Sequence, residues 1–114
     1  MTLPTVTEAI RRIREGTLSP VEILEGCLAR IRAVEPTLRA WVHLDEAGAR
    51  AVARARAEEA EVGKVRGPLH GIPVGIKDIF HVAGMPTTAG AGPFAHETPT
   101  EASATKAPVT GAPP

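Results

Sequence analysis

The sequence has one cysteine, few aromatic residues, no excess charge of either sign and no long apolar run. Cys27 is the single cysteine among 114 residues, so the chain can form no internal disulfide and we expect a cytoplasmic protein. The 13 basic and 13 acidic side chains balance, which is not typical of a protein that binds nucleic acid directly. No apolar run approaches the roughly 20 residues that span a membrane, and the N-terminus lacks a secretion-signal pattern. We therefore expect neither nucleic acid nor membrane as a partner.

Histidine is also sparse, and its spacing excludes the common zinc motifs. No two of the four histidines stand at i and i+4, and no Cys/His cluster exists. The four are His43, His70, His81 and His96. The sequence therefore predicts no metal site.

Helix start and stop signals predict two helices near the N-terminus. Thr5 begins a capping-box sequence, and Gly16 is placed to end that helix. Ser19 followed by Pro20 is the pattern of an N-cap and a first helical position. Pro36 is expected to stop the second helix, because proline disfavours helical backbone in the residue before it.

A strand and a third helix are expected next. Residues 40–44 have the composition of a short strand, with Trp41 as a core anchor. Asp45 is expected to cap an alanine-rich helix that runs to about Val62, and Glu59 is interpreted as surface charge. The apolar stripe of this helix is predicted at Ala47, Ala51, Val52 and Ala55.

Residues 67–80 contain a lysine inside an apolar run. Gly and Pro residues form a turn, and residues 74–80 then have the β-branched and aromatic character of a strand buried on both faces. Lys77 interrupts that run. Most such lysines cover apolar surface with their methylenes and keep the ammonium in water. The alternative is a lysine in a desolvated pocket, where the amine can take up a proton near neutral pH.

Two stretches carry a family resemblance: GPLHGIPVGIKD at 67–78 and GMPTTAG at 84–90. Both closely resemble the amidase signature family, which includes bacterial amidases and the A subunit of tRNA-dependent amidotransferases. The order of the predicted elements is similar too, so the resemblance covers residues 6–101. It implies an α/β fold, with a mixed sheet flanked by helices. It also implies that Lys77 is the catalytic base of a Ser–cis-Ser–Lys triad, that His70 is structural, and that the Thr87-Thr88 loop lines the active-site cleft.

The resemblance implies a reaction as well. In a complete member of the family, a serine attacks a small-molecule amide and a bridging serine relays its proton to the lysine, without metal or organic cofactor. The products are a carboxylate and ammonia. The enzymatic alternative is the amidotransferase A subunit, which releases ammonia from glutamine for a partner subunit. Expected partners are therefore a second copy in a homodimer or the other amidotransferase subunits, while the substrate-binding residues are unknown.

The resemblance stops near residue 101. Residues 1–101 are predicted to be the N-terminal part of an amidase signature domain, and the low-complexity residues 102–114 are expected to be disordered. We interpret the chain as a truncated fragment in which neither Ser19 nor Ser103 is a credible nucleophile. The chain alone is therefore expected to be inactive. An open alternative is a non-catalytic interaction module, which a defined oligomer without amidase activity would favour.

Overall fold

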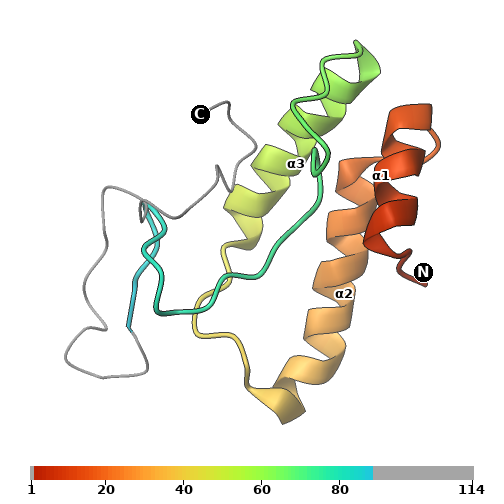
Figure 1. Ribbon diagram of the computed structural model, residues 1–114. Helices are drawn as coiled ribbons and strands as arrows, with labels where there is room; N and C mark the ends of the chain where they lie inside the picture. Colours follow the sequence, from red (N-terminus) through yellow and green to blue (C-terminus); the bar gives the residue numbers. More distant parts are fainter. Residues whose placement is uncertain (1, 89–114) are drawn as a thin grey trace.

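Three α-helices and a long loop make up residues 2–88, the part of the chain that the computed structural model describes (Figure 1). The helices are α1 (Val6–Glu15), α2 (Pro20–Leu38) and α3 (Glu46–Glu61). Helices α2 and α3 run antiparallel side by side, and α1 lies along the first half of α2 (Figure 1). The loop after α3 turns back along the helices and then leaves them (Figure 1). None of the helices within residues 2–88 has both the length and the apolarity needed to cross a bilayer.

The predicted helix starts are confirmed by their capping hydrogen bonds. The Thr5 hydroxyl accepts the backbone N–H of Glu8 at 3.2 Å, and Ser19 accepts that of Val21 at 3.2 Å. The Asp45 carboxylate accepts the Gly48 N–H at 2.9 Å. These side chains satisfy donors that the first helical turn leaves without a backbone partner.

The prediction that Pro36 stops α2 is wrong, because the helix continues to Leu38. Two hydrogen bonds that Glu35 accepts close the turn around the proline. Its carbonyl accepts the N–H of Arg39 at 2.8 Å, and its carboxylate accepts the N–H of Trp41 at 3.2 Å. Arg39 then ends the helix in the left-handed conformation, with φ of 49°. A proline this close to a helix end removes one hydrogen bond without breaking the helix.

Helix α2 is central to the core, because it contributes to both buried clusters. One cluster comprises Ala9, Ile13, Leu18 and Ile23, with Cys27, Ala60 and Ile72 against it. The other comprises Leu24, Leu28 and Ala53, with Val21, Ile31, Leu44 and Ala49 against it. The buried residues of α2 are Pro20, Ile23, Leu24 and Leu28.

The predicted apolar stripe of α3 lies on the wrong face. Ala53 is the buried residue, and Ala49 and Ala60 pack beside it, whereas Val52 is exposed. Alanine occurs all round this helix, so the apolar pattern does not define one face. On the polar side of the helix, Arg50 forms a 2.6 Å ion pair with Glu25 of α2.

Neither predicted strand forms within residues 2–88. Residues 40–44 and 74–80 are irregular, and Trp41, Val74 and Ile79 are 41%, 53% and 53% exposed. Trp41 is therefore not the core anchor that we expected, and residues 74–80 are not buried on both faces. A strand needs a neighbour to accept its backbone hydrogen bonds, and the described part of the chain supplies none. The helices of the expected α/β fold are present here, and its sheet is not confirmed.

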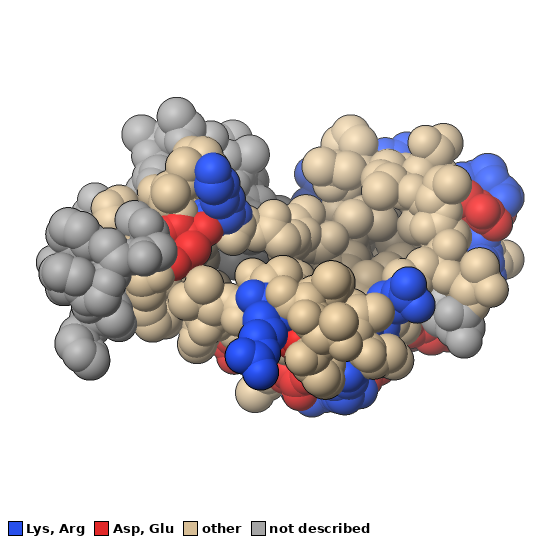
Figure 2. All heavy atoms as spheres, turned by 90° about the horizontal axis from the view of Figure 1, so that it is seen from below, with Lys and Arg blue, Asp and Glu red and all other residues tan. Residues whose placement is uncertain are grey.

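Charges of both signs are mixed over the surface. On the face shown in Figure 2, the basic and acidic side chains alternate instead of gathering by sign. Several of them pair across or along the helices, as Arg11 does with Glu15 at 2.7 Å. The described residues of this face therefore offer no one-signed patch of the kind that binds a polyanion.

Candidate functional site

Lys77 lies in the irregular segment 74–80, and its side chain is exposed. Its carbonyl accepts the N–H of Phe80 at 3.1 Å, which closes a tight turn around Asp78 and Ile79. Within residues 2–88, Lys77 is therefore a lysine whose ammonium lies in water, the first of the two interpretations given above. These residues do not form the desolvated pocket that a neutral lysine base requires.

The turn before this segment presses its backbone against the start of α2. Gly71 has φ of 78°, and a Cβ added there would lie 2.5 Å from Cγ of Pro20 and 3.6 Å from Cδ1 of Ile13. The hydrogen bond from the Ile72 N–H to the Leu69 carbonyl, at 3.0 Å, holds the turn closed. Only glycine fits this position, because it needs both the left-handed conformation and the space of a missing side chain.

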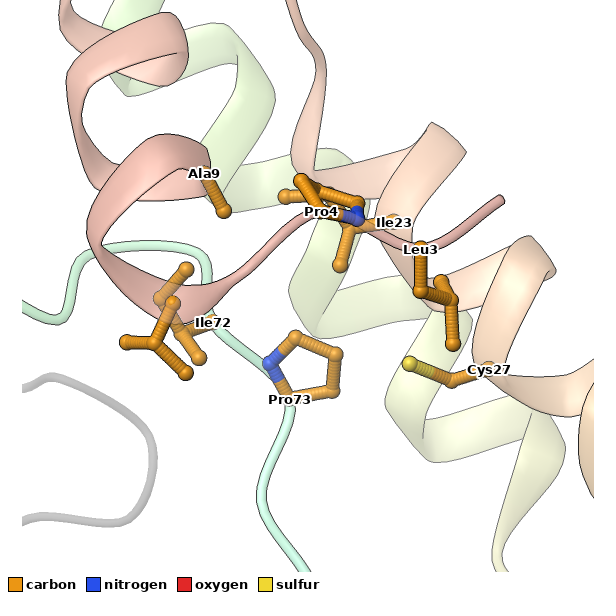
Figure 3. Close-up of a pocket in the computed structure, with 8 residues that line it drawn as sticks. Leu3, Pro4, Ala9, Ile23, Cys27, Ile72 and Pro73 are labelled. Carbon is orange, nitrogen blue, oxygen red and sulfur yellow. The ribbon is translucent and has the colours of Figure 1, made fainter. Parts of the chain in front are cut away.

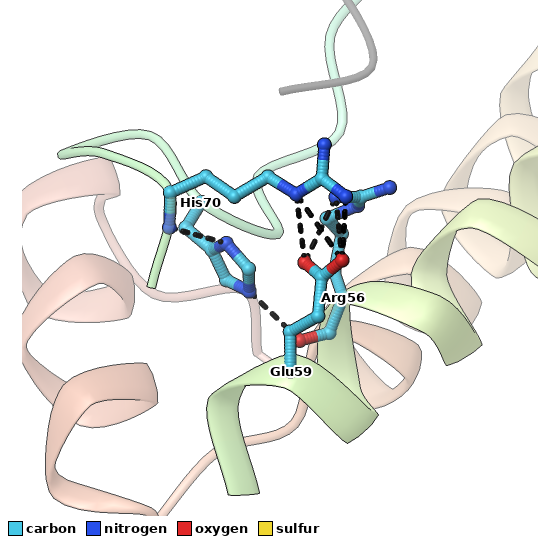
Figure 4. A network of polar contacts seen from close by, with 4 residues as sticks. Arg56, Glu59 and His70 are labelled. Atoms are coloured by element: carbon cyan, nitrogen blue, oxygen red, sulfur yellow. Dashed lines mark hydrogen bonds and ion pairs between the residues drawn. The ribbon is translucent and has the colours of Figure 1, made fainter. Parts of the chain in front are cut away.

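His70 ties the same turn to α3. The ring is 5% exposed, and its Nε2 lies 2.7 Å from the carbonyl oxygen of Arg56 while its Nδ1 accepts the N–H of Arg66 at 3.1 Å. Figure 4 shows the ring between the turn and α3. Both ring nitrogens are occupied by backbone groups, which agrees with the structural role expected for this histidine.

Glu59 lies beside this histidine and is not the plain surface charge that we predicted. Its carboxylate pairs with Arg66 at 2.6 Å and with Arg56 at 2.8 Å (Figure 4). The hydrogen bond from Arg66 is the main reason why the pKa of Glu59 lies below its ordinary value, and the charge of Arg56 adds to the effect. No sequence pattern signals this network, because Arg66 follows the end of α3 and no helical spacing connects it with Glu59.

Two further contacts hold the segment on either side of Lys77. Trp41 packs on Gly75, where an added Cβ would lie 3.3 Å from the ring carbon Cη2. Asp78 accepts the backbone N–H of Thr88 at 2.9 Å and also the Thr88 hydroxyl. The structure thus brings the Thr87-Thr88 loop next to the lysine segment.

The polar contact extends by one more pair. Nδ1 of His81 lies 3.1 Å from the hydroxyl oxygen of Thr87, which is buried. Asp78 and His81 therefore both reach the same short loop. Sequence reasoning missed this pairing, because contacts between two loops leave no periodic pattern to read.

A small apolar cavity lies where the end of the turn, at Ile72 and Pro73, meets α1 and α2. It has a volume of about 120 Å³, and its lining includes Ile23, Cys27, Ile72 and Pro73 (Figure 3). Burial raises the pKa of the Cys27 thiol. The described residues that line the cavity include no charged side chain. We therefore interpret it as a packing defect beside an unreactive thiol.

Residues 2–88 offer neither a metal site nor a nucleophile for Lys77. No group of three or more His, Cys, Asp or Glu residues in this range could hold a metal ion. Ser19 is the only serine in the range, and its hydroxyl caps α2. Ser103 and the predicted tail 102–114 lie outside the described residues.

Comparisons with known proteins agree on one family. The family model described as Amidase matches residues 22–107. The A subunit of the glutamyl-tRNA(Gln) amidotransferase of Chloroflexus aurantiacus is 50% identical over 86 residues, which are 75% of this chain and 18% of that protein. An amidase of Pseudomonas putida is 39% identical over 90 residues, covering 78% of this chain and 19% of that protein.

Solved structures give the same result for the fold. A crystal structure of an amidase matches with a TM-score of 0.69 and 45% identity, over 72% of this chain and 19% of that one. The structure of a peptide amidase with the competitive inhibitor chymostatin matches with a TM-score of 0.77 and 35% identity, over 82% of this chain and 20% of that one. The chain spans about a fifth of the length of these relatives.

Proposed function

The chain belongs to the amidase family, and from this membership we propose that it supplies the catalytic base, Lys77, of a hydrolase that cleaves the C–N bond of a carboxamide. The observation that carries the proposal is the lysine segment itself. Lys77 lies in the family motif, and Asp78 beside it is bonded to the Thr87-Thr88 loop. This arrangement suits a base that faces a cleft.

In the proposed reaction, a serine attacks the carbonyl carbon of the amide. A second serine passes the proton of the nucleophile to the amine of Lys77. The same route returns a proton to the amide nitrogen as the C–N bond breaks, so the leaving group departs as ammonia. Water then releases the acyl group as a carboxylate. The proposal needs no metal ion and no organic cofactor. Proton transfer to a positioned base typically contributes a factor of about 10²–10⁴ to the rate.

Residues 2–88 supply the position of the lysine, and further segments have to complete the site. Burial in a pocket disfavours the charged form of a lysine, so catalysis by a lysine base requires a wall that removes water from Lys77. The matched relatives are about five times as long as the aligned segment. We propose that this wall, both serines and the sheet around residues 74–80 come from segments equivalent to the rest of those relatives.

The A subunit of a tRNA-dependent amidotransferase is the second candidate. The relative of that name in Chloroflexus aurantiacus is 50% identical, against 39% for the Pseudomonas putida amidase. The substrate would then be glutamine, and the partners would be the other subunits of the complex. For the simple amidase, a homodimer is the corresponding proposal. Both versions fit a cytoplasmic protein whose single cysteine forms no disulfide.

A chimera tests the role of Lys77. Residues 22–107 of this chain would replace the matched segment of the Pseudomonas putida amidase, and hydrolysis of a simple amide and of glutamine would be compared. We expect Lys77→Ala to lower kcat at least about 100-fold. The matched control is Lys64→Ala, which removes an exposed lysine after α3 and should leave kcat unchanged. Retention of most activity by the Lys77→Ala chimera would remove Lys77 from the mechanism.

The chain of 114 residues is proposed to have no hydrolase activity alone, because its described part has no nucleophile available to Lys77. Amide hydrolysis that persists through repurification would contradict this. Size-exclusion chromatography separates the remaining alternative. A defined oligomer without activity would favour an interaction module, and aggregation would favour a fragment of an enzyme.

A further inference from the structure

The hydrogen bonds of His70 specify which of its nitrogens carries the proton. Nδ1 accepts the N–H of Arg66, so it has no proton of its own. Nε2 then carries the proton and donates it to the carbonyl of Arg56 at 2.7 Å. The two bonds together hold the ring as the neutral Nε2–H tautomer.

The bond to Arg56 connects two parts of the chain that the sequence separates, and the bond from Arg66 lies within the turn. The Arg56 carbonyl belongs to the interior of α3, whereas Arg66 and His70 belong to the turn. Gly71 follows immediately and packs on Pro20 of α2. The ring is therefore the polar link between the helices and the segment that leads to Lys77.

Glu59 offsets part of the positive charge around the ring. Arg56 and Glu59 face the ring from α3, and Arg66 faces it from the turn. Glu59 pairs with both arginines, so the two guanidinium groups are drawn together over one carboxylate (Figure 4). The exposed ion pair of Arg66 with Glu59 and the hydrogen bond of the buried His70 ring to Arg56 both hold the turn against α3.

We propose that His70 is a positioning residue, which sets the place of Lys77 by fixing residues 66–72 on α3 through its Nε2–H tautomer. The link itself is a property of this chain, and its catalytic consequence rests on the proposed function. His70 touches no substrate in this scheme. It acts only through the backbone that leads from the turn to the lysine.

The tautomer can be measured in the 114-residue chain by ¹⁵N NMR of the histidine rings near neutral pH. We expect the His70 nitrogens to have well-separated shifts, with Nδ1 unprotonated and Nε2 protonated. His43 is exposed and provides the internal reference for a ring in water. A His70 spectrum equal to that of His43, or one with Nδ1 protonated, would overturn the proposal.

Amide hydrogen exchange tests whether the link holds the segment. His70→Ala removes both hydrogen bonds of the ring and is expected to speed exchange of the Ile72 and Phe80 amides about tenfold or more, the size expected for losing one or two buried hydrogen bonds. The amide of Leu28 in α2 should be unchanged, which separates local release from global destabilisation. His43→Ala is the control and should change none of the three. Equal acceleration of all three amides in His70→Ala, or no acceleration, would contradict a positioning role.

Conservative variants of His70 test its bonds to Arg56 and Arg66 separately. Glutamine places an N–H near the position of Nε2, and asparagine places an acceptor near the position of Nδ1. We expect His70→Gln to restore the bond to Arg56 and to recover slower exchange than His70→Ala.

In the chimera, His70→Ala should lower kcat about tenfold with KM unchanged, because the hydrogen bonds that fix the turn are lost, and His70→Gln should recover part of the rate. Unchanged kcat in His70→Ala alongside a large loss in Lys77→Ala would refute the catalytic consequence alone. Full activity of Lys77→Ala would instead refute the proposed function and leave the exchange result to decide the link.

Discussion

Gly71→Ala is the substitution whose cost can be worked out most directly from the structure. Gly71 has φ of 78°, where an alanine is strained by about 1–2 kcal/mol. The new Cβ would also lie 2.5 Å from Cγ of Pro20 and 2.9 Å from its Cβ, so the turn and α2 must separate. Overpacking of this kind typically costs about 1–3 kcal/mol. We therefore expect the free energy of unfolding to fall by about 2–5 kcal/mol in total.

Gly63→Ala is the matched control for the backbone term. Gly63 has φ of 74°, and a Cβ there would meet nothing within 4 Å. The control should therefore lose only about 1–2 kcal/mol. The difference between the two variants isolates the contact with Pro20.

Urea denaturation of the 114-residue chain measures both variants. Circular dichroism follows the three helices, and fluorescence of Trp41, the single tryptophan, follows its packing on Gly75. The linear dependence on urea gives the free energy of unfolding of each variant. If Gly71→Ala were no less stable than Gly63→Ala, Gly71 would not pack against Pro20 of α2 as described. The turn would then not connect the helices to the segment that contains Lys77 in this way.

Three further results are expected. The pKa of Glu59 is lowered mainly by its hydrogen bond from Arg66, so the stabilisation by its carboxylate is fully present above the ordinary glutamate pKa of about 4.3 and is lost as pH falls through the lowered pKa. Urea denaturation from about pH 7 to about pH 3 should therefore show that the free energy of unfolding depends less on pH in Glu59→Gln than in the wild type. The same pH dependence in both proteins would contradict the pairing. Burial raises the pKa of Cys27, so its thiol should react with a maleimide more slowly than free cysteine at about pH 8 and should speed up in urea; reaction at the free-thiol rate would show that the cavity does not shield it. Gly75→Ala should shift the fluorescence of Trp41, because its Cβ would lie 3.3 Å from the ring, while costing less than Gly71→Ala; an unchanged spectrum would show that the two do not touch.

The helix boundaries could be predicted because their signals are local. Ser19 and Asp45 each bond a backbone N–H close by in the sequence, so their roles are readable without tertiary structure. The end of α2 could not be predicted in the same way. The hydrogen bonds that carry it past Pro36 depend on Glu35 and on the path taken by Trp41.

The face of α3 and the strands depended on contacts that the sequence pattern does not specify. An alanine-rich helix has weak periodicity, so its sequence does not indicate that Ala53 is the residue that packs with Leu24 and Leu28 of α2. Residues 74–80 have the composition of a strand but no neighbour within the described part of the chain. Composition shows that a segment is suited to a strand, but the strand forms only where a neighbouring strand pairs with it.

The candidate site was predicted in part. Lys77 was identified through the family motif, since a lone lysine in an apolar run is usually a snorkelling side chain. The bond of Asp78 to Thr88 and the double link of His70 became visible only in three dimensions. The bond of His70 to Arg56 and that of Asp78 to Thr88 join residues at spacings of 14 and 10, which no local rule covers.

The most direct test of the central claim is the crystal structure of the chimera with the Pseudomonas putida amidase. The decisive measurement is the distance from Nζ of Lys77 to the nearest serine Oγ of the amidase portion. We expect a direct hydrogen bond of about 2.6–3.2 Å, with water excluded from the amine. A Lys77 side chain that extends into solvent, with no serine hydroxyl within reach directly or through one water molecule, would contradict its assignment as the catalytic base.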